Sequence, residues 1–76
     1  MNLTKKEFDI LAYFMERAGV VIARDRLVTA VWGGGSFVSE VAVNMHIRSI
    51  RRKLGKYGKL IETVRGSGYR FAEGEG

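Results

Sequence analysis

The sequence concentrates arginine side chains in one short stretch, where Arg48, Arg51 and Arg52 lie within five residues. On a helix these guanidinium groups spread over an arc of about 100°, so that some can reach the base edges of a DNA duplex while others hold its phosphates. Residues 41–70 contain eight Lys or Arg residues against one acidic residue, whereas residues 1–40 contain five of each sign. This asymmetry predicts a polyanionic partner bound on one side; a solvated basic face that aids solubility is the alternative.

Other side chains in the same half of the chain are candidates for reading base sequence. Val41 and Met45 share the outward face of the expected helix with Arg48, and apolar side chains there can contact thymine methyl groups. Harmless surface exposure is an equally good explanation for both. Arg65 lies beside Gly66-Ser67-Gly68, and an arginine at such a corner is expected to enter an adjacent minor groove, which favours A·T-rich DNA. RNA is a less suitable partner, because the major groove of an A-form duplex is too narrow for a helix.

Catalytic and metal chemistry is poorly supported. His46 is the only histidine and the chain has no cysteine, so a packed or phosphate-bonded imidazole is expected rather than a metal ligand. Ser67 has no Asp or second His to activate it, and the segment Gly66-Ser67-Gly68 lacks the Lys-Ser/Thr tail of a phosphate loop. We therefore expect no enzyme activity, no metal and no cofactor. The lack of cysteine is compatible with the reducing cytoplasm, where we expect the protein to act.

The elements that position these residues must fit within one small domain. Seventy-six residues with 46% hydrophobic content predict a single folded unit over residues 1–76, with frayed ends at 1–3 and 72–76. No apolar run approaches the roughly 20 residues that cross a bilayer, and the first residues do not form a secretory signal. A membrane partner is therefore not expected.

The first helix is expected to begin after Thr4, which forms a capping box with Glu7, and to end at Gly19. One apolar stripe on this helix consists of Phe8, Leu11, Met15 and Ala18. A second stripe, Ile10 and Phe14, lies beside it, so the apolar arc is wider than a small domain usually needs. The pattern predicts that something covers the second stripe.

Two further helices are expected, from about Arg24 to Trp32 with Ala23 as a poor cap, and from about Ser39 to Leu54 with Gly55 at its end. A short extended stretch at residues 20–22 precedes them. The expected core positions in the two helices are Leu27, Val28, Val31, Trp32, Val43, Ile47, Ile50 and Leu54.

The loop between these helices contains Gly33-Gly34-Gly35-Ser36, which fits either a natural flexible loop or an engineered linker. After a turn at Tyr57-Gly58-Lys59, β-forming residues 60–65 and 69–71 flank Gly66-Ser67-Gly68 and predict a β-hairpin. The predicted fold is therefore mainly α, with three helices and a C-terminal hairpin.

Short motifs that run through residues 3–71 resemble the winged-helix effector domain of OmpR/PhoB-type bacterial response regulators. In chain order the matching motifs are Leu3-Thr4, Glu7-Phe8, Arg24, Leu27, Val31-Trp32-Gly33, Val43, His46-Ile47, Arg51-Arg52-Lys53-Leu54, Thr63-Val64-Arg65-Gly66 and Gly68-Tyr69-Arg70-Phe71. The combination of the helix and hairpin motifs is quite specific.

The resemblance implies a winged helix-turn-helix transcription factor of a two-component system. The recognition helix 39–54 would lie in the major groove and the wing 60–71 in the adjacent minor groove. The family binds direct repeats as a head-to-tail homodimer, and the loop 33–38 would engage RNA polymerase. The DNA-binding residues expected from the pattern and the resemblance together are Val41, Asn44, Met45, His46, Arg48, Ser49, Arg51, Arg52, Arg65 and Tyr69.

The chain departs from the family pattern at three places. Val41-Ala42 replaces a frequent Arg-Thr pair and Ser49 replaces a frequent basic residue, so base preference does not transfer. The family's N-terminal sheet and receiver domain are not in this sequence. The apolar residues Ile10 and Phe14 fit this absence, because the missing sheet would cover one side of the first helix. We therefore expect either a truncated fragment or a pared-down relative that hides this surface in another way, such as self-association. A protein-interaction module is the rival function; a basic amphipathic membrane-surface helix is a weaker one.

Overall fold

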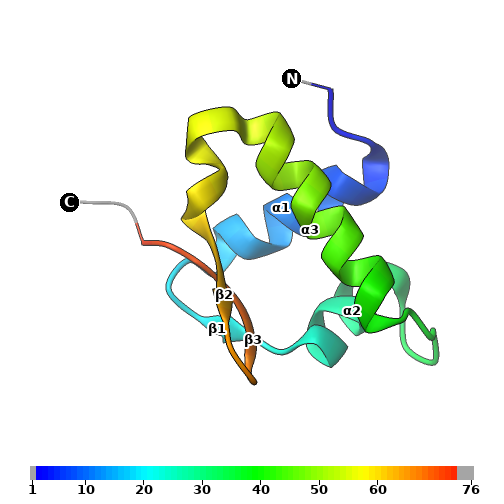
Figure 1. The fold of residues 1–76 in the computed structure, drawn as a ribbon. Helices are drawn as coiled ribbons and strands as arrows, with labels where there is room; N and C mark the ends of the chain where they lie inside the picture. Colours follow the sequence, from blue (N-terminus) through cyan, green and yellow to red (C-terminus); the bar gives the residue numbers. More distant parts are fainter. Residues whose placement is uncertain (1, 74–76) are drawn as a thin grey trace.

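The computed structural model describes residues 2–73, which fold into three α-helices, a short 3₁₀ helix and three short strands (Figure 1). The α-helices are α1 (Lys5–Glu16), α2 (Arg24–Trp32) and α3 (Glu40–Leu54), and the 3₁₀ helix is η1 (Gly55–Leu60). The strands are β1 (Val21–Ile22), β2 (Ile61–Val64) and β3 (Gly68–Phe71). This order confirms the predicted winged helix-turn-helix, in which three helices precede a hairpin.

The hairpin of β2 and β3 gains a third strand from the stretch that precedes α2. The strands are antiparallel in the order β1-β3-β2, and Ile22 of β1 lies opposite Tyr69 of β3. Gly68 begins β3 with φ +140, and a Cβ at this position would overlap the carbonyl oxygen of Ile22. Glycine is therefore required where β1 meets the hairpin.

The helix ends follow the predicted caps, with one exception. Thr4 and Glu7 form the capping box of α1, the hydroxyl of Ser39 accepts from the backbone of α3, and Ala23 gives α2 no side-chain cap. The prediction that Gly19 ends α1 is wrong, because the helix ends at Glu16. Gly19 has φ +87 and donates its N–H to Phe71, so its role is to turn the chain into the sheet.

The buried face of α1 differs from the predicted one. Ile10 and Phe14 are fully buried, whereas Phe8 and Met15 of the first predicted stripe are 59% and 56% exposed. The reason is that α1 packs on α3 and β3 through Ile10 and Phe14, and the ring of Phe14 meets Tyr69 edge-on at 6.2 Å. The prediction that something covers the second stripe is therefore confirmed, whereas the expectation that the missing N-terminal sheet leaves Ile10 and Phe14 exposed is wrong. The exposed apolar side of α1 carries Phe8 and Met15.

The core predictions for α2 and α3 are confirmed. Leu27, Val28, Val43, Ile47 and Ile50 are buried, and the other predicted positions pack against them. The complete buried apolar set is Ile10, Leu11, Phe14, Ile22, Leu27, Val28, Val43, Ile47, Ile50, Ile61 and Tyr69.

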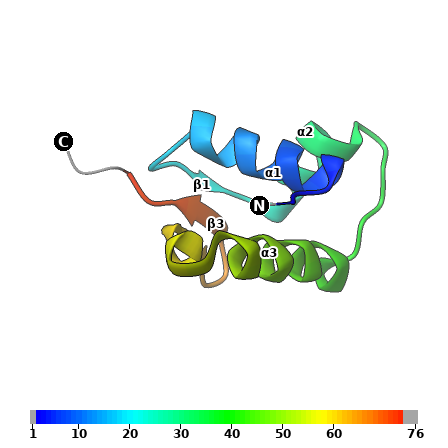
Figure 2. The ribbon, with the colours of Figure 1, turned by 90° about the horizontal axis from the view of Figure 1, so that it is seen from above.

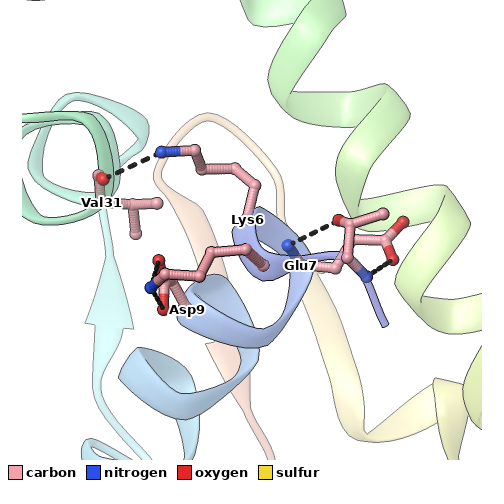
Figure 3. A network of polar contacts seen from close by, with 6 residues as sticks. Lys6, Glu7, Asp9 and Val31 are labelled. Atoms are coloured by element: carbon pink, nitrogen blue, oxygen red, sulfur yellow. Dashed lines mark hydrogen bonds and ion pairs between the residues drawn. The ribbon is translucent and has the colours of Figure 1, made fainter. Parts of the chain in front are cut away.

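The first turn of α1 is tied to both other helices. Lys6 extends its Nζ to the carbonyl of Val31 in α2, at 3.5 Å (Figure 3). Glu7 points toward α3, where it accepts from Ser49 Oγ at 2.5 Å and from Lys53 Nζ at 2.7 Å. The hydrogen bond from Lys53, followed by that from Ser49, lowers the pKa of Glu7 from 4.5 to about 2. A buried carboxylate thus sets the position of α3 on α1.

Both ends of the described chain make contacts with the domain. Leu3 packs against the core, and the N–H of Ala72 donates to the carbonyl oxygen of Leu60 at 2.7 Å. Met1 and residues 74–76, for which fraying was also predicted, lie outside the described residues. Within residues 2–73, no helix is long and apolar enough to cross a membrane.

Candidate nucleic-acid interface

The outward side of α3 is open along its length. Figure 2 shows α3 at one edge of the domain, with α1 and α2 on its other side. Because Val43 and Ile47 face the core, the opposite side of the helix projects to solvent. The four residues predicted to face outward are all exposed there: Val41, Met45, Arg48 and Arg52. The exposed fractions of Val41 and Met45 are 68% and 65%.

The cations on this side are available to an external anion. Among residues 2–73, no hydrogen bond or ion pair engages the guanidinium groups of Arg48, Arg52 or Arg65. By contrast, Arg70 on β3 is paired with Glu62 at 2.7 Å. The three unengaged guanidiniums therefore form the part of the basic surface that a phosphate or a base edge can reach without breaking an internal contact.

One flank of α3 faces the other helices, and two predicted DNA-binding residues lie on it. The imidazole of His46 packs on Trp32 with ring centroids 5.4 Å apart, and it is half-buried. Ser49 donates to Glu7. The prediction that Ser49 belongs to the outward side is wrong, because α1 covers this flank and supplies a carboxylate for its hydroxyl.

The other flank of α3 faces the wing, where Arg51 is used as a clamp. Its Nε and Nη2 donate to the carbonyl oxygen of Ile61 at 2.9 and 2.6 Å, and Nη2 also donates to Thr63 Oγ1 at 2.9 Å. Arginine suits this role because its rigid fork can hold one acceptor with two donors. Arg51 thus fixes β2 against the last turn of α3, and its guanidinium is already occupied.

The side chain of Tyr69 also points into the domain and does not lie at the tip of the wing. Its ring is buried against Phe14, and its hydroxyl donates to Oδ1 of Asn44 on α3. Burial is the largest cause of the raised pKa of the Tyr69 phenol. Of the wing residues that the sequence predicts to bind DNA, Arg65 is exposed in the hairpin turn and Tyr69 lies in the core.

A polar groove of about 420 Å³ separates the first half of α3 from the wing. Sequence reasoning placed Asn44, Arg65 and Tyr69 near this region but missed Arg24 and Glu40. The signal for Glu40 was its position one helical turn before Asn44. Arg24 donates to the carbonyl of Val38 at 3.2 Å, a contact between α2 and the end of the following loop that no sequence pattern indicates. The lining residues are Arg24, Glu40, Asn44, Thr63, Val64, Arg65, Gly66, Ser67, Gly68 and Tyr69.

The loop between α2 and α3 presents one large apolar side chain. Phe37 is 90% exposed, and positive φ at Gly33 and Gly35 lets the chain turn sharply before it. The residues that line the groove do not include any of the loop 33–38.

Comparison with known proteins places the chain in a family. The family profile described as "Transcriptional regulatory protein, C terminal" matches residues 1–71. Over 67 residues the chain is 43% identical to the phosphate regulon transcriptional regulatory protein PhoB of Pseudomonas aeruginosa, a match that covers 87% of this chain and 29% of that protein. The chain therefore spans less than a third of the length of this relative.

Solved structures agree with the profile. The DNA-binding domain of Bacillus subtilis CssR is similar with a TM-score of 0.81 and 38% identity, over 91% of this chain and 76% of that one. The DNA-binding domain of Klebsiella pneumoniae RstA, in complex with the RstA box, has a TM-score of 0.79 and 31% identity, over 93% and 73% of the two chains. These relatives are transcription regulators and not enzymes, as the motifs predict. The chain belongs to the C-terminal domain family of transcriptional regulatory proteins, the winged-helix DNA-binding domains of OmpR/PhoB-type response regulators.

Proposed function

We propose that this domain regulates transcription by sequence-specific binding to double-stranded DNA, with α3 in the major groove and the wing at the adjacent minor groove. The observation that carries the proposal is the outward side of α3. It presents Arg48 and Arg52, unengaged by any residue in the described range 2–73, on the same side as two exposed apolar residues. A helix fits the major groove of B-DNA, where arginines bind phosphates or guanine edges.

Base preference in this arrangement comes partly from Val41 and Met45. Both side chains can contact thymine methyl groups, the apolar feature of the major groove. Replacement Met45→Asn should then weaken binding selectively at duplex positions that contain A·T. A loss of affinity that is equal on all duplexes, or no loss, would remove this role from Met45.

The wing contributes Arg65 to the minor groove. Its guanidinium is exposed in the turn after β2, and narrow A·T-rich minor grooves attract inserted arginines through their negative potential. Among the other predicted contact residues, we assign Asn44 to the DNA side of α3. His46, Ser49, Arg51 and Tyr69 support binding by holding α3 in place against its neighbours, since each already has an internal partner.

The whole protein's partners are a further part of the proposal, because the chain spans 29% of its PhoB relative. We assign it to a response regulator that acts in the cytoplasm and binds direct repeats as a homodimer. Phe37 makes the loop 33–38 the candidate contact with RNA polymerase, because it offers a large exposed apolar side chain. A transcription assay with Phe37→Ala tests this contact separately from DNA binding.

A protein-interaction module is the alternative function, and the exposed Phe8, Met15 and Phe37 favour it. Measurement of duplex affinity against salt separates the two. A domain that grips phosphates shows a steep linear fall of log K with log salt, at about 0.9 per neutralised phosphate. The variant Arg48→Ala/Arg52→Ala should reduce the slope by about 2 if both contact phosphates.

The matched control is Arg17→Ala, because Arg17 is an exposed arginine directly after α1, outside α3 and the wing, with its guanidinium carbon 3.9 Å from the ring centroid of Tyr13. It should leave the slope unchanged. A flat response of the wild-type domain to salt would favour the protein-interaction function.

A further inference from the structure

One hydrogen bond connects the buried core to the groove between α3 and the wing. The Tyr69 hydroxyl donates to Oδ1 of Asn44, whose side chain is exposed in that groove. The Tyr69 ring is itself held edge-on by Phe14 at 6.2 Å. The orientation of the Asn44 carboxamide is therefore set from inside the domain, before any DNA is bound.

The consequence concerns which atoms of Asn44 remain for a partner. A free asparagine reads adenine by accepting from N6 through its oxygen and donating to N7 through its nitrogen. In this structure the Tyr69 hydroxyl uses one of the two lone pairs of this oxygen and fixes the plane of the carboxamide, so the group cannot turn to aim both atoms at one base while the bond holds, and Nδ2 remains as its donor. Loss of this acceptor would leave the hydroxyl of the buried Tyr69 unsatisfied, and this keeps the pair together.

We propose that Tyr69 is a positioning residue that presents Asn44 to DNA as a hydrogen-bond donor and withholds the two-point contact with adenine. The acceptor on DNA is a phosphate oxygen or the acceptor edge of guanine or thymine. The inference rests on the proposed placement of α3 in the major groove. In this inference, the base preference of Asn44 depends on its hydrogen bond with Tyr69 and not on the asparagine alone.

The test uses Tyr69→Phe, which removes the hydroxyl and keeps the ring against Phe14, together with Asn44→Ala and the double variant. Affinities are measured on a duplex selected by the wild-type domain and on a panel in which each position carries each base. If the acceptor is a base, Tyr69→Phe raises the relative affinity for adenine at one position by about tenfold. If the acceptor is a phosphate, it lowers affinity about threefold on every duplex.

In both cases the double variant should bind as Asn44→Ala alone does, because Tyr69 acts through Asn44. Effects of the two substitutions that add independently would overturn the inference, since they would mean that Tyr69 only packs the wing. An unchanged affinity and an unchanged base profile for Tyr69→Phe would also overturn it.

A second measurement is independent of the variants' stability. In the folded wild-type domain labelled with ¹⁵N, the Asn44 side-chain amide protons should shift and become protected from exchange when the duplex is added. Unperturbed amide signals would overturn the inference.

The variant Arg48→Ala separates failure of the inference from failure of the proposed function. If Arg48→Ala weakens binding while Tyr69→Phe and Asn44→Ala do not, only the role of the pair is wrong. If none of the three substitutions changes affinity, α3 does not bind the duplex.

Discussion

Arg51 and Arg52 are neighbours in sequence with the same chemistry, and the structure predicts different consequences for their loss. Arg51 clamps β2 through three hydrogen bonds to two acceptors, whereas Arg52 is exposed on the outward side of α3. Replacement Arg51→Ala should therefore reduce the stability of the domain as well as its affinity for DNA. Replacement Arg52→Ala should reduce affinity alone.

The expected loss for Arg51→Ala is about 2 kcal/mol. Hydrogen bonds to charged groups contribute about 1.5–3 kcal/mol each, and the half-exposed position of Arg51 puts these bonds at or below the low end of that range. The carbonyl of the buried Ile61 also loses both of its donors from Arg51. For a domain of this size, 2 kcal/mol lowers Tm by about 8–16 °C. Arg52→Ala should stay within about 0.5 kcal/mol of the wild type.

Urea and thermal unfolding followed by circular dichroism, with duplex affinity measured in parallel, checks this prediction. The variant Arg51→Lys keeps the charge and loses the fork, so it should retain most of the salt dependence of binding while it loses stability. Equal stabilities for Arg51→Ala and Arg52→Ala would refute the clamp and return Arg51 to the DNA-binding set.

Three other predictions follow from particular contacts. The pKa of Glu7 is lowered from 4.5 to about 2, so its contribution to stability is complete above pH 4.5 and is lost as pH falls toward 2. The full pKa shift corresponds to about 3 kcal/mol of stability, which solvent screening at the partly exposed Lys53 reduces to about 2 kcal/mol. The variant Glu7→Gln should not show this loss of stability between pH 4.5 and pH 2 in acid unfolding. A pH profile identical to that of the wild type would contradict the role of Glu7. Gly68→Ala should lower the free energy of unfolding by about 3 kcal/mol or more, because its Cβ would overlap β1, whereas Gly34→Ala, with open space around it, should have little effect on a urea melt; similar melts would contradict the packing of β1. Phe37→Ala should leave duplex affinity within about twofold and reduce transcription activation in vitro, and a matching loss of DNA affinity would place the loop on the DNA side.

The helix boundaries and most of the core could be predicted because they depend on local signals. Ser39 and Gly55 mark the ends of α3, and the spacing of Val43 and Ile47 identifies its buried side. The face of α1 could not be assigned, because its apolar arc is too wide to show which part meets a neighbour. Glu7 lies within the buried part of this arc, where Thr4 of the capping box and the partners Ser49 and Lys53 on α3 satisfy its carboxylate.

The candidate site divides in the same way. The helical periodicity of α3 correctly predicted its outward side with Val41 and Arg48, because that side lies opposite the buried stripe of the same helix. The periodicity could not predict which neighbouring element covers each flank of the helix. Ser49 and Arg51 were therefore grouped with the exposed residues, although α1 and β2 supply their partners. The bond between Asn44 and Tyr69 joins residues 25 positions apart and has no signal in the sequence.

In the proposed complex, α3 lies in the major groove and the wing lies in the minor groove beside it. Dimethyl sulfate footprinting on a selected duplex tests both parts at once, because the reagent methylates guanine N7 in the major groove and adenine N3 in the minor groove. The wild-type domain should protect guanine N7 within the site and adenine N3 immediately beside it, and Arg65→Ala should lose only the adenine protection. Protection confined to adenine N3, with every guanine N7 still reactive, would contradict the placement of α3.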